Sequence, residues 1–170
     1  MNFLAAFDVT GIPAPQGSKT RMPNGAVLEA ASKTGRAKHK AWRKAVQHEA
    51  EQVRDDQPYD GPLAVTILFR FPMPQSRPAA VRKRGVGWHS VVPDKDKCQR
   101  STLDALADAK LIVNDARVCR FDVNAIEVMG AHLGGPGASV VLHGLDDADL
   151  STYSSNTAET DQLSEGGPGA

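Results

Sequence analysis

Hydrophobic residues alternate with polar residues in three segments of the chain, and this period of two predicts three β-strands. The first segment covers residues 3–9 and ends at a Gly-Ile-Pro sequence, and the second covers residues 63–71 and ends at a proline. The third runs from residue 119 to residue 128, and a change of phase near its end indicates a β-bulge. Residues 140–142 are expected to add a short edge strand.

Two further segments repeat apolar residues at helical spacing. The first, residues 36–54, carries lysines and arginines on its early solvent face, and the second, residues 94–109, stacks charged residues four positions apart. The segments 11–35 and 72–92 are predicted to be loops. This order of elements predicts an α/β (α+β) domain with a small mixed β-sheet and two main helices.

The C-terminal part of the chain differs in composition from the rest. From residue 144 onward it contains few apolar residues and many Ser, Thr, Asp and Gly residues, and it closes on Gly-Gly-Pro-Gly. Such a segment buries too little apolar surface to offset the entropy of ordering. We therefore expect one folded domain over residues 1–143 and a disordered acidic tail over residues 144–170.

The net charge of zero hides an asymmetry. Residues 1–130 contain 20 basic and 14 acidic residues, whereas residues 131–170 contain no basic residue and 6 acidic ones. A basic body favours a polyanionic partner, although runs of charge also occur as ordinary solvated faces. The residues of the body that we expect to contact phosphates are Lys19, Arg21, Lys38, Lys40, Arg43, Lys44, Arg82, Lys83 and Arg84.

The cysteine content and the apolar runs indicate a cellular compartment. The only cysteines are Cys98 and Cys119, and we expect both to be free thiols in the core. No stretch resembles a signal peptide, and no apolar run approaches the roughly 20 residues of a membrane helix. These features predict a soluble, cytoplasmic protein.

Three aspartates flank the second predicted helix. Asp94 and Asp96 stand at its start, and Asp115 follows it just before the third strand, so the three carboxylates can converge. Magnesium prefers hard oxygen ligands and is held by few carboxylates, with waters and phosphate oxygens completing its shell. Spacing alone favours a helix cap, a first-turn acid and a turn residue at the same three positions, because acids are common at helix starts and in turns.

Four motifs in a fixed order separate these two interpretations. They are Pro93–Asp96, Arg100, Leu103–Leu106 and Asn114–Val118. Together they resemble the signature of the RusA-type Holliday junction resolvases, which reads Asp-x-Asp-Asn, a basic residue four positions on, Asp-Ala-Leu, and a later Asp-Asp before a strand. The segment Phe7–Pro13 also resembles the opening strand and turn of that family.

The resemblance implies roles for individual residues. Asp94, Asp96 and Asp115 match the metal-binding acids of the family, and Arg100 matches its catalytic lysine. An arginine keeps the positive charge but presents a planar fork in place of an ammonium group.

Two further positions depart from the family's pattern, and one residue gains a predicted partner. Lys97 stands where the family has asparagine, and as a neighbour of the acids it is a second candidate to face the phosphate. Asn114 replaces the first acid of the Asp-Asp pair. Asp104 lies one turn after Arg100, and this spacing predicts an ion pair that orients the guanidinium.

The function that the resemblance implies is a Mg²⁺-dependent endodeoxyribonuclease, with Mn²⁺ as a substitute, that resolves Holliday junctions and related branched DNA in recombination and repair. It also implies a homodimer and is compatible with a phage or prophage origin in a bacterial cell. Two alternatives remain open: a DNA-binding member of the fold without activity, and a nuclease that cuts flaps or replication forks. Cleavage assays with magnesium on different DNA shapes separate them.

Overall fold

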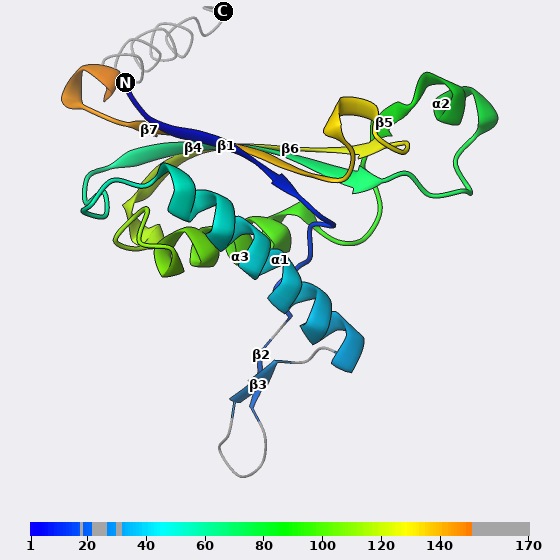
Figure 1. Cartoon of the computed structure of the whole chain (residues 1–170), viewed down its shortest axis with the longest axis horizontal. Coiled ribbons are helices and arrows are strands. Elements are labelled where there is room, and N and C mark those ends of the chain that lie inside the picture. The colour runs from blue at the N-terminus through cyan, green and yellow to red at the C-terminus, as the bar shows by residue number, and fades with distance from the viewer. Residues whose placement is uncertain (18, 22–26, 30–31, 151–170) are drawn as a thin grey trace, which may run out of the picture.

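A five-stranded mixed sheet with helices on one face forms the body of the protein (Figure 1). The computed structural model describes residues 1–17, 19–21, 27–29 and 32–150. The strand order is β1-β7-β4-β6-β5, with β4 and β6 parallel and the other pairs antiparallel. The five strands are β1 (Asn2–Thr10), β4 (Leu63–Pro72), β5 (Val86–Trp88), β6 (Val118–Val128) and β7 (Gly137–Gly144).

The helical layer consists of α1 (Lys33–Val53) and α3 (Lys95–Asp108), which lie side by side under the sheet in Figure 1. The short helix α2 (Ala79–Arg84) forms a projection together with β5. The N-terminal half of α1 also extends beyond the sheet, at the same end of the molecule as this projection (Figure 1). The smaller elements are the hairpin of β2 (Lys19–Arg21) and β3 (Val27–Glu29) and the 3-10 turns η1 (Asp115–Arg117), η2 (His132–Gly134) and η3 (Asp147–Leu150).

The core lies between the sheet and the two long helices. Every second side chain of β4, from Leu63 to Phe71, is buried against them. Trp42 of α1 packs on Phe69 with ring centroids 6.3 Å apart, and its indole N–H donates to the Thr102 hydroxyl of α3 at 3.1 Å. A single buried side chain thus joins α1, α3 and the sheet, and it helps to fix the position of α3.

The structure confirms the predicted α/β fold with a small mixed sheet, its three alternating strands and its two main helices. The edge position predicted for residues 140–142 is wrong, because β7 pairs with β1 on one side and with β4 on the other. The predicted bulge lies at the start of β6 instead of near its end. Val118 pairs with Leu63 and Arg120 with Ala64, which leaves Cys119 as the extra residue.

Both segments that were predicted to be loops contain short elements. The segment 72–92 holds α2 and β5, which are only six and three residues long. Gly85 ends α2 in a left-handed conformation with φ of 78°, a conformation that glycine adopts without strain. The segment 11–35 holds the β2–β3 hairpin and the first residues of α1. Elements this short carry no hydrophobic periodicity, which explains why the pattern did not predict them.

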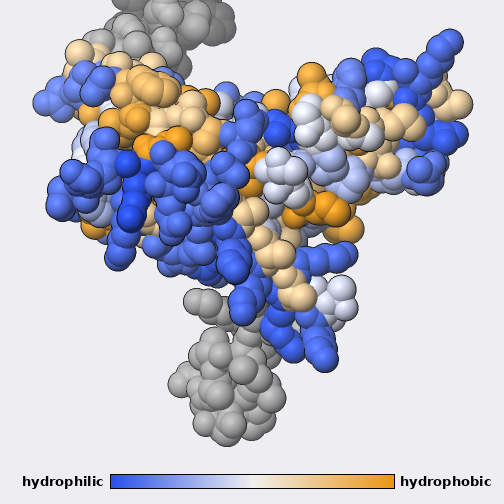
Figure 2. Space-filling view, in the orientation of Figure 1, coloured by the Kyte–Doolittle hydropathy of each residue, from blue (hydrophilic) through white to orange (hydrophobic). Residues whose placement is uncertain are grey.

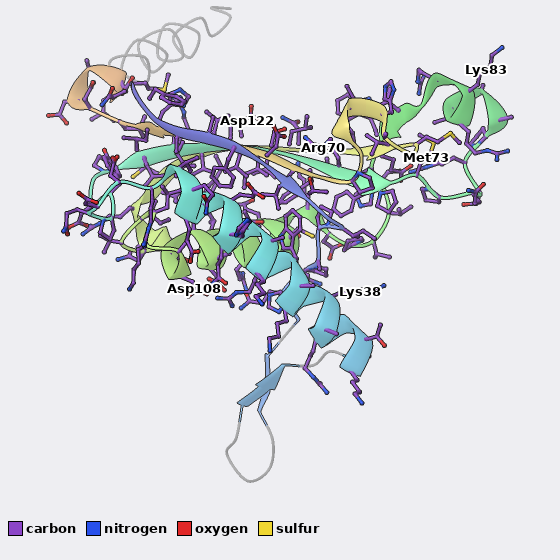
Figure 3. All side chains as sticks on the ribbon, in the orientation of Figure 1. Lys38, Arg70, Met73, Lys83, Asp108 and Asp122 are labelled. Atoms are coloured by element: carbon purple, nitrogen blue, oxygen red, sulfur yellow. The ribbon has the colours of Figure 1, made fainter. Side chains whose placement is uncertain are left out.

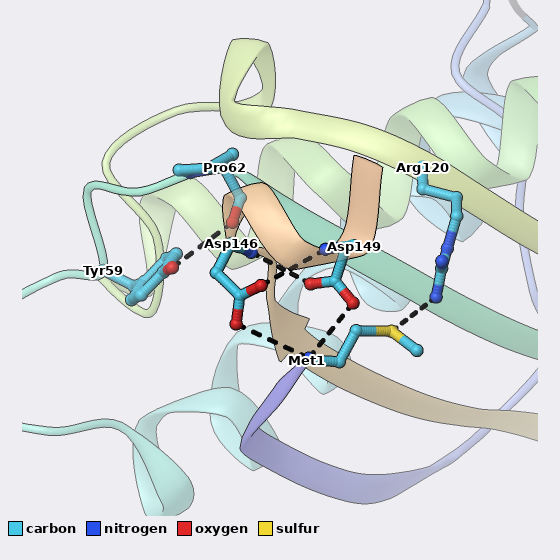
Figure 4. Close-up of polar contacts among 6 residues, drawn as sticks. All are labelled: Met1, Tyr59, Pro62, Arg120, Asp146 and Asp149. Carbon is cyan, nitrogen blue, oxygen red and sulfur yellow. Dashed lines mark hydrogen bonds and ion pairs between the residues drawn. The ribbon is translucent and has the colours of Figure 1, made fainter. Parts of the chain in front are cut away.

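The residues after β7 contact the body of the domain as far as Leu150. The Leu145 amide donates to the Pro62 carbonyl at 2.9 Å. The amino group of Met1 donates to the Asp149 carboxylate at 3.1 Å and lies 3.8 Å from that of Asp146 (Figure 4). Of the predicted tail, residues 151–170 lie outside the described residues. Within the described part, no helix is long and apolar enough to cross a membrane.

Candidate active site at the start of α3

The predicted acids lie where α3 and β6 begin. Asp94 immediately precedes α3, Asp96 belongs to its first turn, and Asp115 opens the η1 turn that leads into β6. The Lys95 ammonium donates to the Val123 carbonyl at 3.0 Å, which ties the start of α3 to β6. An open pocket of about 270 Å³ lies between these elements, and its walls are Asp96, Gln99, Arg100, Leu103, Asp115 and Phe121.

The local structure does not use these carboxylates as caps. The Asp94 side chain makes no capping hydrogen bond, although its residue occupies the N-cap position of α3. The η1 turn is capped by Asn114, whose side-chain oxygen accepts from the Ala116 amide at 3.0 Å. The carboxylates of Asp96 and Asp115 make no hydrogen bond or ion pair with any residue that the structure describes. Their exposed carboxylates are therefore available to a ligand.

The three acids are distributed over two adjoining pockets. Asp96 and Asp115 line the pocket described above, whereas Asp94 and Asp96 line a second one of about 560 Å³, together with the segment from His89 to Pro93. Within the described ranges, no three His, Cys, Asp or Glu side chains form a ready metal cage. Magnesium is commonly held by only one or two carboxylates with waters and substrate phosphates, so the chemistry of this donor set fits that ion.

The negative charges of the acids affect the pKa of a buried thiol, that of Cys98. Cys98 is buried, and burial first, then the negative charges of Asp96 and Asp94, raise the pKa of its thiol to about 12. The thiol therefore stays protonated at neutral pH and is unsuited to bind a metal ion. Cys119 is also free but exposed, so the prediction of a core position is confirmed for Cys98 and wrong for Cys119.

Cysteine labelling tests this description directly. We expect iodoacetamide to label the native protein once, at Cys119, because alkylation requires an accessible thiolate. Peptide mapping by mass spectrometry identifies the labelled residue, and denatured protein should be labelled at both positions. Rapid labelling of Cys98 in the native protein would contradict the buried position of the thiol.

Two basic residues stand beside the acids. Arg100 lies in the wall of the pocket shared by Asp96 and Asp115, and it has no hydrogen-bond or ion-pair partner in the described part of the chain. The Lys97 ammonium lies 3.1 Å from the Asp94 carboxylate, so it neutralises that acid. Of the two candidates for a phosphate contact, Arg100 is the one whose charge is not paired with an acid among the described residues.

The predicted ion pair between Arg100 and Asp104 is wrong. The Asp104 carboxylate accepts from the Gln16 side-chain amide at 3.1 Å and lies 3.7 Å from the Arg43 guanidinium. Gln16 belongs to the segment after β1, and Arg43 belongs to α1. Asp104 therefore joins three parts of the fold, which leaves Arg100 free to face the pocket.

The predicted phosphate contacts form two groups. Lys38 lies toward the free end of α1, whereas Lys83 lies on α2 at the other projection (Figure 3). A pocket of about 510 Å³ on α1 is lined by Arg36, His39, Lys40, Arg43, Lys44, Gln47 and Asp108. Figure 2 shows that hydrophilic residues dominate the visible surface of this helical layer. The side chains of Lys19 and Arg21 lie outside the described part of the structure.

Some members of these groups already have partners. Arg43 forms an ion pair with Asp108 of α3, so it links the two helices. Arg82 donates to the Gln75 side chain at 3.4 Å, and Arg84 donates to the Val86 carbonyl at 3.0 Å. By contrast, Lys38, Lys40 and Lys44 make no ion pair with the described residues, and of these Lys40 and Lys44 also line the pocket on α1. These two lysines are therefore the clearest candidates on α1 for contact with an external anion.

A buried charge network lies beside the site at residues that were not among the predicted site residues. Glu127 of β6 is 0% exposed, and both of its oxygens accept from Arg77, at 2.6 and 2.7 Å. The pKa of the Glu127 carboxyl lies below its ordinary value, mainly because of these hydrogen bonds. The sequence contained one signal for it, because Glu127 occupies an inward-facing position of a strand, beside Phe71 of β4.

The comparison with protein families agrees with this geometry. Residues 20–134 match the family described as Endodeoxyribonuclease RusA, a range that includes all three acids and Arg100. No curated protein matches the sequence. The matched range covers more than half of the chain and spans both long helices together with β4 and β6. The chain therefore belongs to the RusA endodeoxyribonuclease family.

Proposed function

We propose that this chain is a Mg²⁺-dependent endodeoxyribonuclease that resolves four-way DNA junctions during recombination and repair. The observation that carries the proposal is the pocket in which Asp96, Asp115 and Arg100 meet without partners of their own. Carboxylates that are exposed, uncapped and adjacent to a free guanidinium suit a metal ion on one side and a phosphate on the other. Mn²⁺ would be accepted at the same oxygen ligands.

In this proposal the residues have distinct tasks. Asp96 and Asp115 offer hard oxygen ligands, and Asp94 adds a third from the neighbouring pocket. A bound magnesium ion supplies activation of water and neutralisation of charge on the phosphate. Arg100 places a permanent positive charge where the phosphate oxygens gain charge during hydrolysis. Lys97 balances the charge of Asp94 and so limits repulsion of the DNA backbone.

The same proposal includes a homodimer. A four-way junction has approximate two-fold symmetry, and an isologous dimer presents two identical sites to opposed strands. Two symmetric nicks, each leaving a 5′-phosphate and a 3′-hydroxyl, would separate the junction into two duplexes. A mass of twice 18.1 kDa by light scattering is the expected result for the free protein.

A cleavage assay on three DNA shapes tests the function. A four-way junction, a replication fork and a linear duplex with identical arm sequences are incubated with the protein, with Mg²⁺ or with EDTA. We expect paired nicks in the junction with Mg²⁺ alone. Equal cutting of the fork would favour the flap and fork nuclease, and junction binding without any cleavage would favour the DNA-binding member that lacks activity.

The basic residues should govern the salt dependence of junction binding. Because each phosphate contact releases counterions, loss of one contact lowers the slope of log K against log salt by about 0.9. We expect the pair Lys40→Ala with Lys44→Ala to lower it by up to about twice that amount, and Arg82→Ala with Arg84→Ala to lower it similarly.

The control for this experiment is Lys110→Ala, which removes an exposed lysine beyond the end of α3. Affinities are measured by fluorescence anisotropy at several salt concentrations. If both double variants keep the slope of the control, these residues lie outside the DNA footprint, and Lys19 and Arg21 become the main candidates.

A further inference from the structure

The most unusual feature beyond the acids is the fully buried carboxylate of Glu127. It lies between two basic side chains that come from different segments. Arg77 binds both of its oxygens, and the Nδ1 atom of His89 lies 3.5 Å from Oε1. His89 is almost fully buried and stacks on Phe71, with ring centroids 3.9 Å apart and planes inclined by 17°.

The partners of Glu127 hold the segment that leads to the acids. Arg77 also donates to the Trp88 carbonyl at 3.3 Å and to the Ser90 hydroxyl at 3.2 Å. The other ring nitrogen of His89, Nε2, lies 3.1 Å from the Pro93 carbonyl. Pro93 immediately precedes Asp94, so the network reaches the backbone of the acidic site.

The same segment forms a wall of the pocket that Asp94 and Asp96 share. That pocket is lined by every residue from His89 to Asp96, with Ala125 of β6 behind them. The amide of His89 donates to the Ala125 carbonyl at 3.1 Å, which fixes the segment to β6. Between these attachments Val91 and Val92 are exposed and make no core contacts. Polar contacts, together with the stacking of His89 on Phe71, therefore determine the path of the chain into Asp94.

A buried ion pair is a weak source of stability, because desolvation offsets much of the attraction between the charges. Its fixed directions of hydrogen bonding, however, specify one arrangement of the groups that it joins. We propose that Glu127 is a positioning residue, which acts through Arg77 and His89 to hold residues 88–93 and so to place Asp94 and Asp96 relative to Asp115. This inference rests on the proposed nuclease function.

The principal test is Glu127→Gln, which keeps the size of the side chain and removes its charge. Groups that orient metal ligands typically change metal affinity or activity by about 10- to 100-fold when they are lost. We expect a rise of about that size in the Mg²⁺ concentration for half-maximal cleavage, with junction affinity in EDTA unchanged. Glu127→Asp should recover part of the loss. Arg77 is a partly exposed residue, and Arg77→Lys keeps its charge but loses the planar guanidinium that donates to both Glu127 oxygens. This variant should give an intermediate effect.

A matched control exists on the opposite face of the sheet. There Arg70 donates to Asp8 at 3.2 Å, and Ser139 donates to the same carboxylate oxygen at 2.6 Å. Asp8→Asn weakens a second arginine–carboxylate network, in which the Asp8 side chain is 72% exposed and which makes no contact with residues 88–93. It should lower stability without raising the Mg²⁺ requirement, which separates positioning from a general loss of stability.

Two readouts do not depend on cleavage. Hydrogen exchange by mass spectrometry should show faster exchange in a peptide that covers residues 88–92, where the His89 amide is bonded to Ala125, in Glu127→Gln than in Asp8→Asn, and Mn²⁺ titration should show weaker metal binding. Equal exchange and equal metal affinity in the two variants would overturn the proposal. If the wild type cuts no junction, the nuclease proposal fails by itself, while these two readouts still decide whether Glu127 positions the segment.

Discussion

Asp96→Asn is expected to abolish DNA cleavage while leaving junction binding intact or tighter. Asp96 is the acid that lines both pockets of the candidate site. A metal ion bound in either pocket would therefore lose a ligand in this variant. Loss of a group that merely orients a ligand lowers activity by about 10- to 100-fold, so loss of a ligand itself should exceed about a hundredfold. Removal of a negative charge next to the phosphate favours binding.

The measurement is single-turnover cleavage of a labelled junction, with binding measured in parallel without metal. Asp122→Asn is the control, because Asp122 is an exposed acid of β6 that lines neither pocket, and its carboxylate accepts from the Asn124 side chain (Figure 3). It should cut at the rate of the wild type. If Asp94→Asn, Asp96→Asn and Asp115→Asn all cut at nearly that rate, the metal site has been placed wrongly.

Trp42→Ala is expected to lower the free energy of unfolding by about 3–5 kcal/mol, the usual range for truncation of a buried tryptophan. Trp42 is only 2% exposed and connects α1 to Phe69 of the sheet and to Thr102 of α3. The variant leaves a cavity in the layer that supports the acids and also removes one of the two partners of the buried Thr102 hydroxyl, which still donates to the Cys98 carbonyl.

Urea denaturation followed by circular dichroism measures this effect, with His48→Ala on the exposed face of α1 as control. The control should change stability by no more than about 0.5 kcal/mol. Trp42→Phe should be intermediate, because it restores most of the volume but not the hydrogen bond to Thr102. A loss below about 1 kcal/mol in Trp42→Ala would contradict the central position of this side chain.

The long elements of the fold could be predicted because their burial is periodic. Residues 63–71 alternate between buried and more exposed positions, with Ala64 and Arg70 as exceptions, and β4 forms there. The short α2 and β5 could not be predicted, since their positions depend on Arg77 and on pairing with β6. The exposure of Cys119 has a similar cause. β5 pairs only with the last residues of β6, so β6 begins at an open edge of the sheet.

The acids of the candidate site could be predicted from the sequence, but the network of Glu127, Arg77 and His89 beside them could not. The order of motifs predicted that Asp94, Asp96, Asp115 and Arg100 would meet. Asp96, Asp115 and Arg100 line one pocket, whereas Asp94 lines the adjoining pocket with Asp96. The network around Glu127 joins residues 50 positions apart, because Arg77 and Glu127 come from separate segments. No local pattern encodes such a contact, since it depends on which strands become neighbours in the sheet.

We propose that Asp94, Asp96 and Asp115 hold the catalytic metal ion. The most direct measurement is a crystal structure of the protein soaked in Mn²⁺, with the ion located by its anomalous scattering. We expect a peak about 2 Å from carboxylate oxygens of Asp96 and of Asp115 or Asp94, within reach of Arg100. A peak bound only by other residues, in a protein that cuts junctions in solution, would contradict it.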